Sequence, residues 1–179
     1  GQQLLLKSGS FTPEQNIGRV ENFQQWSNTR FAGKSYCIIQ FDHSTTAAER
    51  RQVEKQTGIR FFDYMPRWAF LSEVPQAFDV NQLAQYGVRA ILPYEGAQKI
   101  SPKLANRPFP EWMQKGDKVE LYVQIMDGVN REQVQAQFLS NQMTFVRWKN
   151  EFTAVVQIQE AQLNNLGNIP WVKYVLQTS

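Results

Sequence analysis

The second half of the chain changes from the hydrophobic period of a strand to that of a helix. Between residues 119 and 125, apolar side chains occupy every second position, and this period of two predicts a half-buried strand. Asp127-Gly128 interrupts the alternation, and Asn130 is a favourable N-cap for a helix that follows it. The apolar residues that we expect on one side of this helix are Val134, Phe138 and Leu139.

Four further segments complete this half of the chain. Residues 143–148 and 152–158 predict two strands joined by the polar turn Lys149-Asn150-Glu151, and β-branched residues are frequent in the second strand. Residues 161–166 predict a short helix, and residues 171–176 predict a last strand. The order is therefore strand, helix, strand, strand, helix, strand.

The first half of the chain repeats this order at a shift of 84 positions. Ile38-Ile39-Gln40-Phe41 falls on Tyr122-Val123-Gln124-Ile125, and the positions keep apolar character rather than identity. A repeat of this length indicates a duplicated small domain, because solenoid repeats have periods of roughly 20–50 residues. The strands expected in the first half are 36–41, 59–64, 67–74 and 88–92, and the helices are 46–57 and 79–86.

This element order predicts an α+β fold with two tandem ferredoxin-like (βαββαβ) domains, each an antiparallel sheet with helices on one face. Ser44 or Thr45 is expected to cap the first helix, and Gly58 and Gly87 are expected to end the two helices of the first domain. The predicted organisation is an N-terminal extension at 1–34, a first unit at 35–94, a linker at 95–117 and a second unit at 118–179.

The two segments outside the repeat contain several glycines and prolines and a few apolar residues. Leu4-Leu5-Leu6 is a candidate extra edge strand. The linker is too long for a simple turn. Because it also contains apolar residues, we expect it to pack against the folded part of the protein. These residues are Ile100, Leu104, Phe109 and Trp112.

The sheet faces that the helices leave open are the first candidate for function. If the apolar side chains of 119–125 face the helices, the side chains between them point to the open face. An open face with this much apolar character marks a docking surface. The alternative is that the two units, or the linker, cover each other's faces. The residues predicted on the open faces are Ile38, Gln40 and Asp42 in the first unit and Tyr122, Gln124 and Met126 in the second.

Composition and charge support a folded protein that does not bind nucleic acid. Hydrophobic residues make up 42% of the chain, which is enough for real cores, and the net charge of +3 comes from scattered Lys and Arg. The third strand of each unit, 67–74 and 152–158, lacks the glycines of RNA-binding sheets, and the second copy has no basic residue. We therefore expect no nucleic-acid partner.

Candidate catalytic chemistry is sparse. The one histidine, His43, stands between Asp42 and Ser44, but neighbouring residues at a strand end point in different directions, so we expect no catalytic relay. The one cysteine, Cys37, lies in an apolar run, is predicted to be a buried thiol, and excludes an internal disulfide. No cluster has metal-ligand spacing, and no glycine-rich phosphate loop occurs. We expect no enzymatic activity, metal or cofactor in this chain.

Three segments of the first unit carry a resemblance to a known family. They are the strand 36–41 that ends in Gln-Phe, the stretch 58–66 that ends in Asp-Tyr-Met-Pro, and the strand 69–74 before Pro75. The first 95 residues are similar to the N-terminal prosegment of secreted bacterial subtilisin-like serine proteases, which is related to the subtilisin propeptide inhibitors.

The resemblance implies a role in the maturation of a protease. Prosegments of this family dock an open sheet face on the catalytic domain, template its folding and inhibit it, while their C-terminal residues enter the substrate cleft like a product. The expected partner is thus a subtilisin-like catalytic domain in cis, and the corresponding tail here is Gln177, Thr178 and Ser179. A usual propeptide has one unit, so the duplication leaves open which unit docks.

Two other functions remain open from the sequence. Paired domains of this plan bind amino acids in regulatory proteins, and a structural or adhesion module of a cell-envelope protein would also fit. No apolar stretch approaches the roughly 20 residues of a membrane span. The chain begins with Gly1 rather than methionine, as a secreted protein does after its signal peptide is removed and as an excised domain also would. We expect a secreted, periplasmic or cell-envelope location without membrane insertion.

Overall fold

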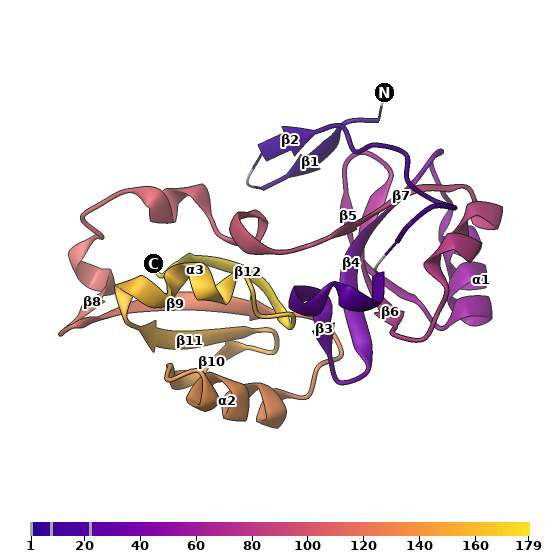
Figure 1. Ribbon diagram of the computed structural model, residues 1–179. Helices are drawn as coiled ribbons and strands as arrows, with labels where there is room; N and C mark the ends of the chain where they lie inside the picture. Colours follow the sequence, from indigo (N-terminus) through magenta and orange to yellow (C-terminus); the bar gives the residue numbers. More distant parts are fainter. Residues whose placement is uncertain (1, 8, 22) are drawn as a thin grey trace. The chain divides into compact units, whose positions relative to one another are not determined.

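The computed structural model describes residues 2–7, 9–21 and 23–179, and it divides into two compact units, Gly1–Tyr94 and Glu95–Ser179. Both units are α+β and have the ferredoxin-like strand order, as the repeated pattern predicts (Figure 1). Each unit is described by itself below.

The sheet of the first unit has β4 at its centre. β4 pairs antiparallel with β6 on one side and β7 on the other, and β5 pairs with the outer side of β6. This order is the one that a ferredoxin-like domain requires. The elements are β3 (Arg30–Phe31), β4 (Lys34–Phe41), α1 (Ala47–Thr57), β5 (Arg60–Met65), β6 (Ala69–Pro75), the 3₁₀ helix η3 (Val80–Tyr86) and β7 (Val88–Pro93).

The main core of the first unit lies between its sheet and its helices. Every second residue of β4 contributes to it, together with Val53 from α1 and Leu83 from η3. Phe23 is buried in the same core, and its ring meets the Trp26 ring edge to face at 5.2 Å between centroids. The segment before β3 therefore belongs to the packing of this unit. The β4 residues in this core are Cys37, Ile39 and Phe41.

The N-terminal residues form a separate small sheet. β1 (Leu4–Leu6) pairs antiparallel with β2 (Gly9–Phe11), and of the two residues between the strands, Lys7 is described and Ser8 lies outside the described part. The backbone N–H of Leu5 donates to the carbonyl of Pro66, and the N–H of Arg67 donates to the carbonyl of Gln3 at 3.0 Å. The leucine run thus joins the turn between β5 and β6 instead of extending the main sheet at its edge.

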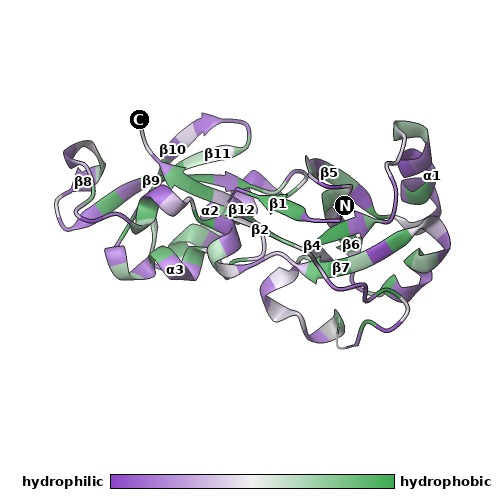
Figure 2. Ribbon diagram, turned by 90° about the horizontal axis from the view of Figure 1, so that it is seen from above, coloured by the Kyte–Doolittle hydropathy of each residue, from purple (hydrophilic) through white to green (hydrophobic). Residues whose placement is uncertain are grey.

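The second unit repeats the same topology. Its sheet has the order β10-β11-β9-β12, so β9 occupies the central position that β4 has in the first unit. Hydrophobic and hydrophilic residues alternate along β9, as its changing colour shows (Figure 2). The elements are β8 (Gln114–Lys115), β9 (Lys118–Ile125), α2 (Arg131–Ser140), β10 (Thr144–Asn150), β11 (Thr153–Ile158), η7 (Glu160–Gln162), α3 (Leu163–Leu166) and β12 (Val172–Gln177).

The segment that precedes β9 packs on the second unit. Leu104 and Phe109 are buried, as expected for part of the linker, and the N–H of Ser101 donates to the carbonyl of Val175 in β12 at 2.9 Å. Trp112 is 56% exposed, but its indole N–H donates to the carbonyl of Thr178 at 2.9 Å. The 3₁₀ helices of this segment are η4 (Gly96–Lys99), η5 (Pro102–Ala105) and η6 (Glu111–Met113).

Most helix ends lie where the sequence predicts them. Gly58 and Gly87 both have a left-handed backbone, with φ of 77° and 79°, and end α1 and η3. Asn130 caps α2 through its side chain, as predicted. The prediction of Ser44 or Thr45 as the cap of α1 is wrong, because Thr46 takes this position and forms a capping box with Glu49.

One residue of α2 points away from the sheet against expectation. Val134 and Phe138 are fully buried, whereas Leu139 is 78% exposed. Val134 and Phe138 are four residues apart and share a helix face, but each further residue turns by about 100°. Leu139 therefore lies outside the buried stripe of the helix.

Candidate functional site

The sheet of the second unit has one covered and one half-exposed face along β9. Val119, Leu121, Val123 and Ile125 are buried, and the residues between them are only half-buried. The alternation predicted for this strand is confirmed. The half-exposed residues of β9 are Lys118, Glu120, Tyr122 and Gln124.

Tyr122 lies at the centre of this half-exposed face. Strand pairing places Val155 of β11 beside Tyr122, and Arg147 of β10 follows next to Val155. The Nζ atom of Lys149 lies 4.6 Å from the centroid of the Tyr122 ring, a cation–π contact. We call the surface formed by Lys118, Glu120, Tyr122, Gln124, Arg147 and Lys149 the Tyr122 face.

The electrostatics of the Tyr122 face favour negative charge near its centre. The Tyr122 hydroxyl lies 3.4 Å from the hydroxyl of Ser179. Hydrogen bonding to Ser179 lowers the pKa of Tyr122, and the positive charges of Lys149 and Arg147 lower it further. Arg147 and Lys149 are exposed, so both can reach a partner.

The C-terminal residues run along the edge of the same face. Gln177 is the last residue of β12 and pairs with Leu121. Thr178 is buried, its hydroxyl lies 3.5 Å from the carbonyl oxygen of Glu120, and its own carbonyl accepts the indole N–H of Trp112. Tyr122, Gln124 and the tail that the sequence selected therefore lie together in one unit.

Met126 does not share this exposure. It is fully buried, and its N–H donates to the carbonyl of Trp171 at 2.9 Å. The strand ends at Ile125, so the alternation that placed Met126 on the open face no longer applies at that position. The expectation of Met126 as an accessible docking residue is wrong.

The corresponding face of the first unit is closed. Ile38 and Gln40 are both fully buried, so the expectation that they form an accessible surface is wrong. The Gln40 amide donates to the carbonyls of Gln2 at 2.9 Å and Arg67 at 3.1 Å. Its side-chain oxygen accepts a hydrogen bond from Arg89 at 2.8 Å. This amide thus has partners on both of its polar atoms.

The N-terminal segment supplies much of this closure. Arg89, which is buried, also donates to the carbonyl of Pro13 at 2.8 Å. The Asn16 side chain donates to the carbonyl of Ile91 at 2.7 Å and accepts from its N–H at 2.9 Å, so it completes the outer edge of β7. Periodicity cannot reveal this role, because the contacts join residues about 75 positions apart.

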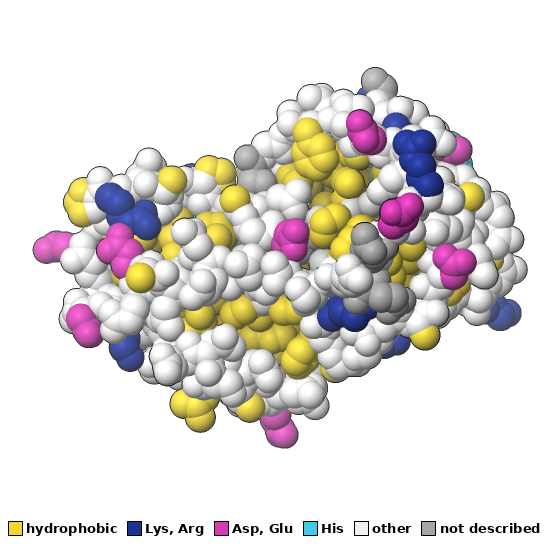
Figure 3. Space-filling model, in the orientation of Figure 1, with side chains coloured by type: hydrophobic (Ala, Val, Ile, Leu, Met, Phe, Trp, Pro, Cys, Tyr) yellow, Lys and Arg dark blue, Asp and Glu magenta, His cyan; other side chains and the backbone are white. Residues whose placement is uncertain are grey.

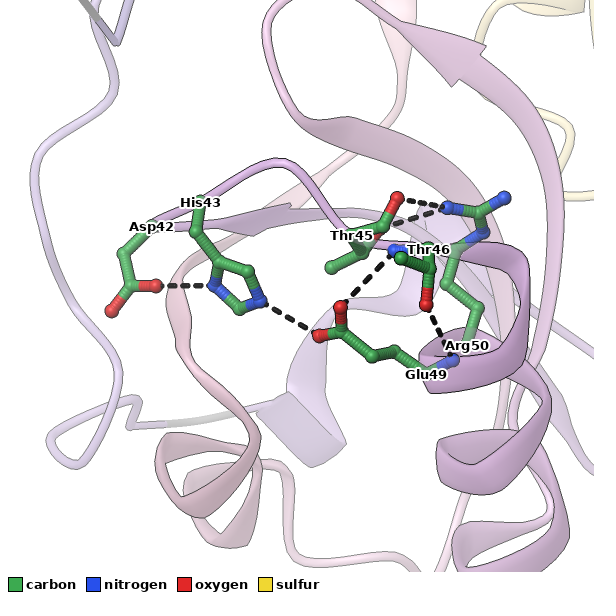
Figure 4. Close-up of polar contacts among 6 residues, drawn as sticks. All are labelled: Asp42, His43, Thr45, Thr46, Glu49 and Arg50. Carbon is green, nitrogen blue, oxygen red and sulfur yellow. Dashed lines mark hydrogen bonds and ion pairs between the residues drawn. The ribbon is translucent and has the colours of Figure 1, made fainter.

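His43 lies in a cluster of carboxylates at the N-terminus of α1 (Figure 4). Its Nδ1 atom is 2.7 Å from Asp42 Oδ1, and its Nε2 atom is 2.9 Å from Glu49 Oε2. The expectation that Asp42 and His43 diverge is wrong, because the Asp42 side chain folds back to the ring. Hydrogen bonds to Glu49 and Asp42 raise the pKa of His43.

This cluster is organised for structure and not for nucleophilic catalysis. A catalytic triad needs a hydroxyl or thiol on the ring nitrogen that faces away from the aspartate, and here a second carboxylate from Glu49 occupies that side. Both ring nitrogens face carboxylate oxygens, which favours the doubly protonated ring and leaves neither nitrogen facing a hydroxyl or thiol. Arg50 continues the cluster by donating to the carbonyl and the hydroxyl of Thr45, each at 2.9 Å.

Lys99 is a buried charge that the sequence does not reveal. It is fully buried in η4, and its Nζ atom donates to the carbonyls of Ile169 at 2.9 Å and Pro170 at 3.4 Å. Burial lowers the pKa of Lys99 to about 7. The surrounding sequence, Gly-Ala-Gln-Lys, resembles an exposed turn and gives no signal of this burial.

Other candidate chemistry is limited in the described residues. Cys37 is buried, and burial raises the pKa of its thiol to about 12, so it is not a thiolate at neutral pH. Across residues 2–7, 9–21 and 23–179, no group of three or more His, Cys, Asp or Glu residues could hold a metal ion. No helix in this part of the chain is long and apolar enough to span a bilayer.

The charges on the surface are mixed. On the face drawn in Figure 3, a few Lys and Arg side chains are scattered among a few Asp and Glu side chains, and hydrophobic side chains appear in patches. A continuous basic stripe of the kind that tracks a nucleic-acid backbone is not visible on that face.

Comparison with known proteins adds one family. No curated protein and no solved structure matches this chain. Residues 5–95 match a family model described as a domain of unknown function, DUF8729. The match begins in β1 and ends one residue after the first compact unit, so it includes most of the small N-terminal sheet and the whole main sheet of the first unit. Because this match covers just over half of the chain, the chain belongs to the DUF8729 family.

Proposed function

We propose that the chain is the non-catalytic N-terminal region of a secreted subtilisin-like serine protease. In this role it docks on the catalytic domain in cis, assists its folding and inhibits it. The observation that carries the proposal is the Tyr122 face, a half-exposed sheet face on a ferredoxin-like unit, with the C-terminal residues beside it.

The residues of the family resemblance support the proposal because they meet in space. The strand that ends in Gln40-Phe41 and the stretch that ends in Tyr64-Met65-Pro66 are more than 20 positions apart in the chain. In the fold, the Gln40 amide donates to the carbonyl of Arg67, directly after that stretch, at 3.1 Å. The segments that carry the resemblance therefore lie side by side in the sheet of the first unit, as the proposal requires.

The physical properties of the units fit a domain that is completed by a partner. The two compact units, Gly1–Tyr94 and Glu95–Ser179, are small domains, and small domains bury a smaller fraction of their surface than large ones. Docking of a sheet face that buries about 800 Å² on each side is typical of a stable inhibitor complex. The chemistry at His43 and Cys37 supplies no nucleophile of its own, so proteolysis would reside in the catalytic domain.

The test is refolding of the catalytic domain that we expect to be encoded after Ser179. The denatured domain is diluted into buffer with an equimolar amount of this chain, with an unrelated protein of similar mass, or alone. We expect a higher yield of active protease with the chain, and inhibition of the folded protease when the chain is added in trans. Equal yields in all three samples together with no inhibition would contradict the proposal.

A further inference from the structure

The two units offer very different sheet faces to a partner. In the first unit, the Gln40 amide and the buried Arg89 are committed to the N-terminal segment. Opening this face would leave a guanidinium and several backbone carbonyls without partners, which is costly for buried polar groups. Gln124 occupies the same repeat position as Gln40 in the second unit but is only half-buried.

The Tyr122 face has an excess of positive charge. It contains three basic residues, Lys118, Arg147 and Lys149, and one acidic residue, Glu120. The Glu120 carboxylate accepts a hydrogen bond from Gln157 at 3.2 Å, and Lys118 donates to Thr144 at 2.9 Å. Arg147 and Lys149 are exposed beside the Tyr122 ring, so they are the charges best placed to meet a partner.

The edge of this sheet is less suited to binding than its face. β10 is the outer strand, and its pairing with β11 is irregular between Phe145 and Arg147 and again between Trp148 and Asn150. Such bulges, together with charged side chains on an edge, disfavour the addition of a further strand. A partner is therefore expected to lie across the side chains of the sheet face.

We infer that the second unit carries the docking surface, that this surface is the Tyr122 face, and that it binds an acidic protein surface whose carboxylates pair with Arg147 and Lys149. Complementary charges steer the encounter and fix the register of a complex. For the identity of the partner, the inference rests on the proposed function, since the acidic surface would belong to the catalytic domain. The position and the charge preference of the surface do not depend on that identity.

The first experiment needs no protease. The full chain is titrated with poly-L-glutamate as an acidic probe, and amide chemical shifts are recorded by NMR. We expect the shift changes to concentrate on β9 and β10 around Tyr122, Arg147 and Lys149. Changes that are absent or spread evenly over both units would overturn the inference. Equally localised changes with a single-stranded oligonucleotide would also overturn it, in favour of nucleic acid.

The second experiment uses a double charge reversal, Arg147→Glu with Lys149→Glu. The matched control is Arg51→Glu with Lys55→Glu, which makes the same charge change on exposed residues of α1. For inhibition of the catalytic domain in trans, we expect the inhibition constant to rise about 10-fold or more for the first variant and to change little for the control. Raising the salt concentration should weaken the wild-type complex, so the inhibition constants of the wild type and the charge-reversed variant should become more similar.

The outcomes separate the two proposals. If the wild-type chain inhibits and the Arg147→Glu, Lys149→Glu variant inhibits equally well, the assignment of the Tyr122 face is wrong while the proposed function stands. If the wild-type chain does not inhibit but poly-L-glutamate shifts the Tyr122 face, the proposed function fails and the surface assignment stands. If the Arg147→Glu, Lys149→Glu variant unfolds at a lower temperature but inhibits as well as the wild type, the two side chains stabilise the chain itself and do not contact the partner. That result would also overturn the assignment.

Discussion

Gln40 and Gln124 are the same residue at equivalent positions of two equivalent sheets, yet their surroundings differ completely. Gln40 is fully buried and hydrogen-bonded to Gln2, Arg67 and Arg89, whereas Gln124 is half-buried on the Tyr122 face. The residue that corresponds to Arg89 in the second unit is Lys173, which instead pairs with Asp127 at 2.8 Å. Duplication therefore preserved the sheet and the core on its helix side. The sheet face opposite the helices differs between the two copies.

The helices differ in a similar way. α2 covers its sheet with two fully buried residues, Val134 and Phe138. The equivalent positions of α1 are charged: Glu54 accepts the N–H of Phe61 at 2.9 Å, and Arg50 lies 4.5 Å from the Phe70 ring centroid. At these two helix positions the first unit therefore uses polar contacts, whereas the second unit uses apolar packing.

The largest expected effect tests this difference in packing. Phe138→Ala should lower the free energy of unfolding by about 3–5 kcal/mol, because it removes a fully buried ring that contacts Trp171 edge to face at 4.9 Å. Its neighbour provides the control, since Leu139→Ala should change the stability by less than about 0.5 kcal/mol. Urea unfolding followed by circular dichroism measures both. Equal effects would mean that the helix faces the sheet in another orientation.

The next effect sharpens the comparison of the two glutamines. Gln40→Leu should lower the free energy of unfolding by about 2–4 kcal/mol. It removes one hydrogen-bond partner each from buried Arg89 and from the carbonyls of Gln2 and Arg67. Gln124→Leu should lower the free energy of unfolding by less than about 0.5 kcal/mol, because Gln124 is only half-buried. The same denaturation measurements apply. Similar losses for the two variants would remove the distinction between a closed and an open face.

A smaller effect concerns the pH dependence of the second unit. Burial holds the pKa of Lys99 near 7, below its unfolded value of 10.5, so between pH 7 and pH 10.5 the unfolded chain binds a proton that the folded unit does not. Stability should therefore rise with pH in this window, by at most about 1.4 kcal/mol per pH unit. Lys99→Met should abolish the rise when unfolding is measured at pH 7, 8 and 9. A rise that persists in the variant would assign it to another group.

The smallest effect has the opposite sign and belongs to the first unit. Hydrogen bonds to Glu49 and Asp42 raise the pKa of His43 above its unfolded value of 6.5. The stability that this contact contributes is complete below pH 6.5 and is lost as the pH rises through the raised folded pKa. His43→Gln should flatten this decline in melting temperature, and an NMR titration of the ring gives the pKa directly. A measured pKa at or below 6.5 would contradict the geometry.

The sequence predicted the fold well because the fold depends on local pattern. The period of two in β9, the cap at Asn130 and the left-handed glycines at 58 and 87 each act over a few neighbouring residues. The errors have local causes as well. The cap of α1 is Thr46 because only Thr46 stands three residues before Glu49 and can form the capping box, and Leu139 lies one position beyond the buried helix stripe.

The candidate site was predicted only in part. Alternation placed Tyr122 and Gln124 on the half-exposed face, and the end of β12 is next to them. Arg147 was visible in the sequence as a basic residue of a predicted strand. Nevertheless, Lys149, Arg147 and Trp112 were not selected from the sequence as site residues. Their relation to Tyr122 depends on strand order and on the bulges in β10, which a hydrophobic period does not encode.

The sequence by itself determined that this protein is a duplicated ferredoxin-like fold with a buried thiol, because hydrophobic period, turn residues and residue inventory are properties of the chain alone. Only the tertiary structure decided that the face with Ile38 and Gln40 in the first unit is closed and that the Tyr122 face of the second unit remains half-exposed. The closure comes from Gln2, Pro13 and Asn16, which bond to residues 38 to 76 positions away. Contacts at such separation follow from how strands and segments pack, and two copies with the same local pattern can therefore differ in what they expose.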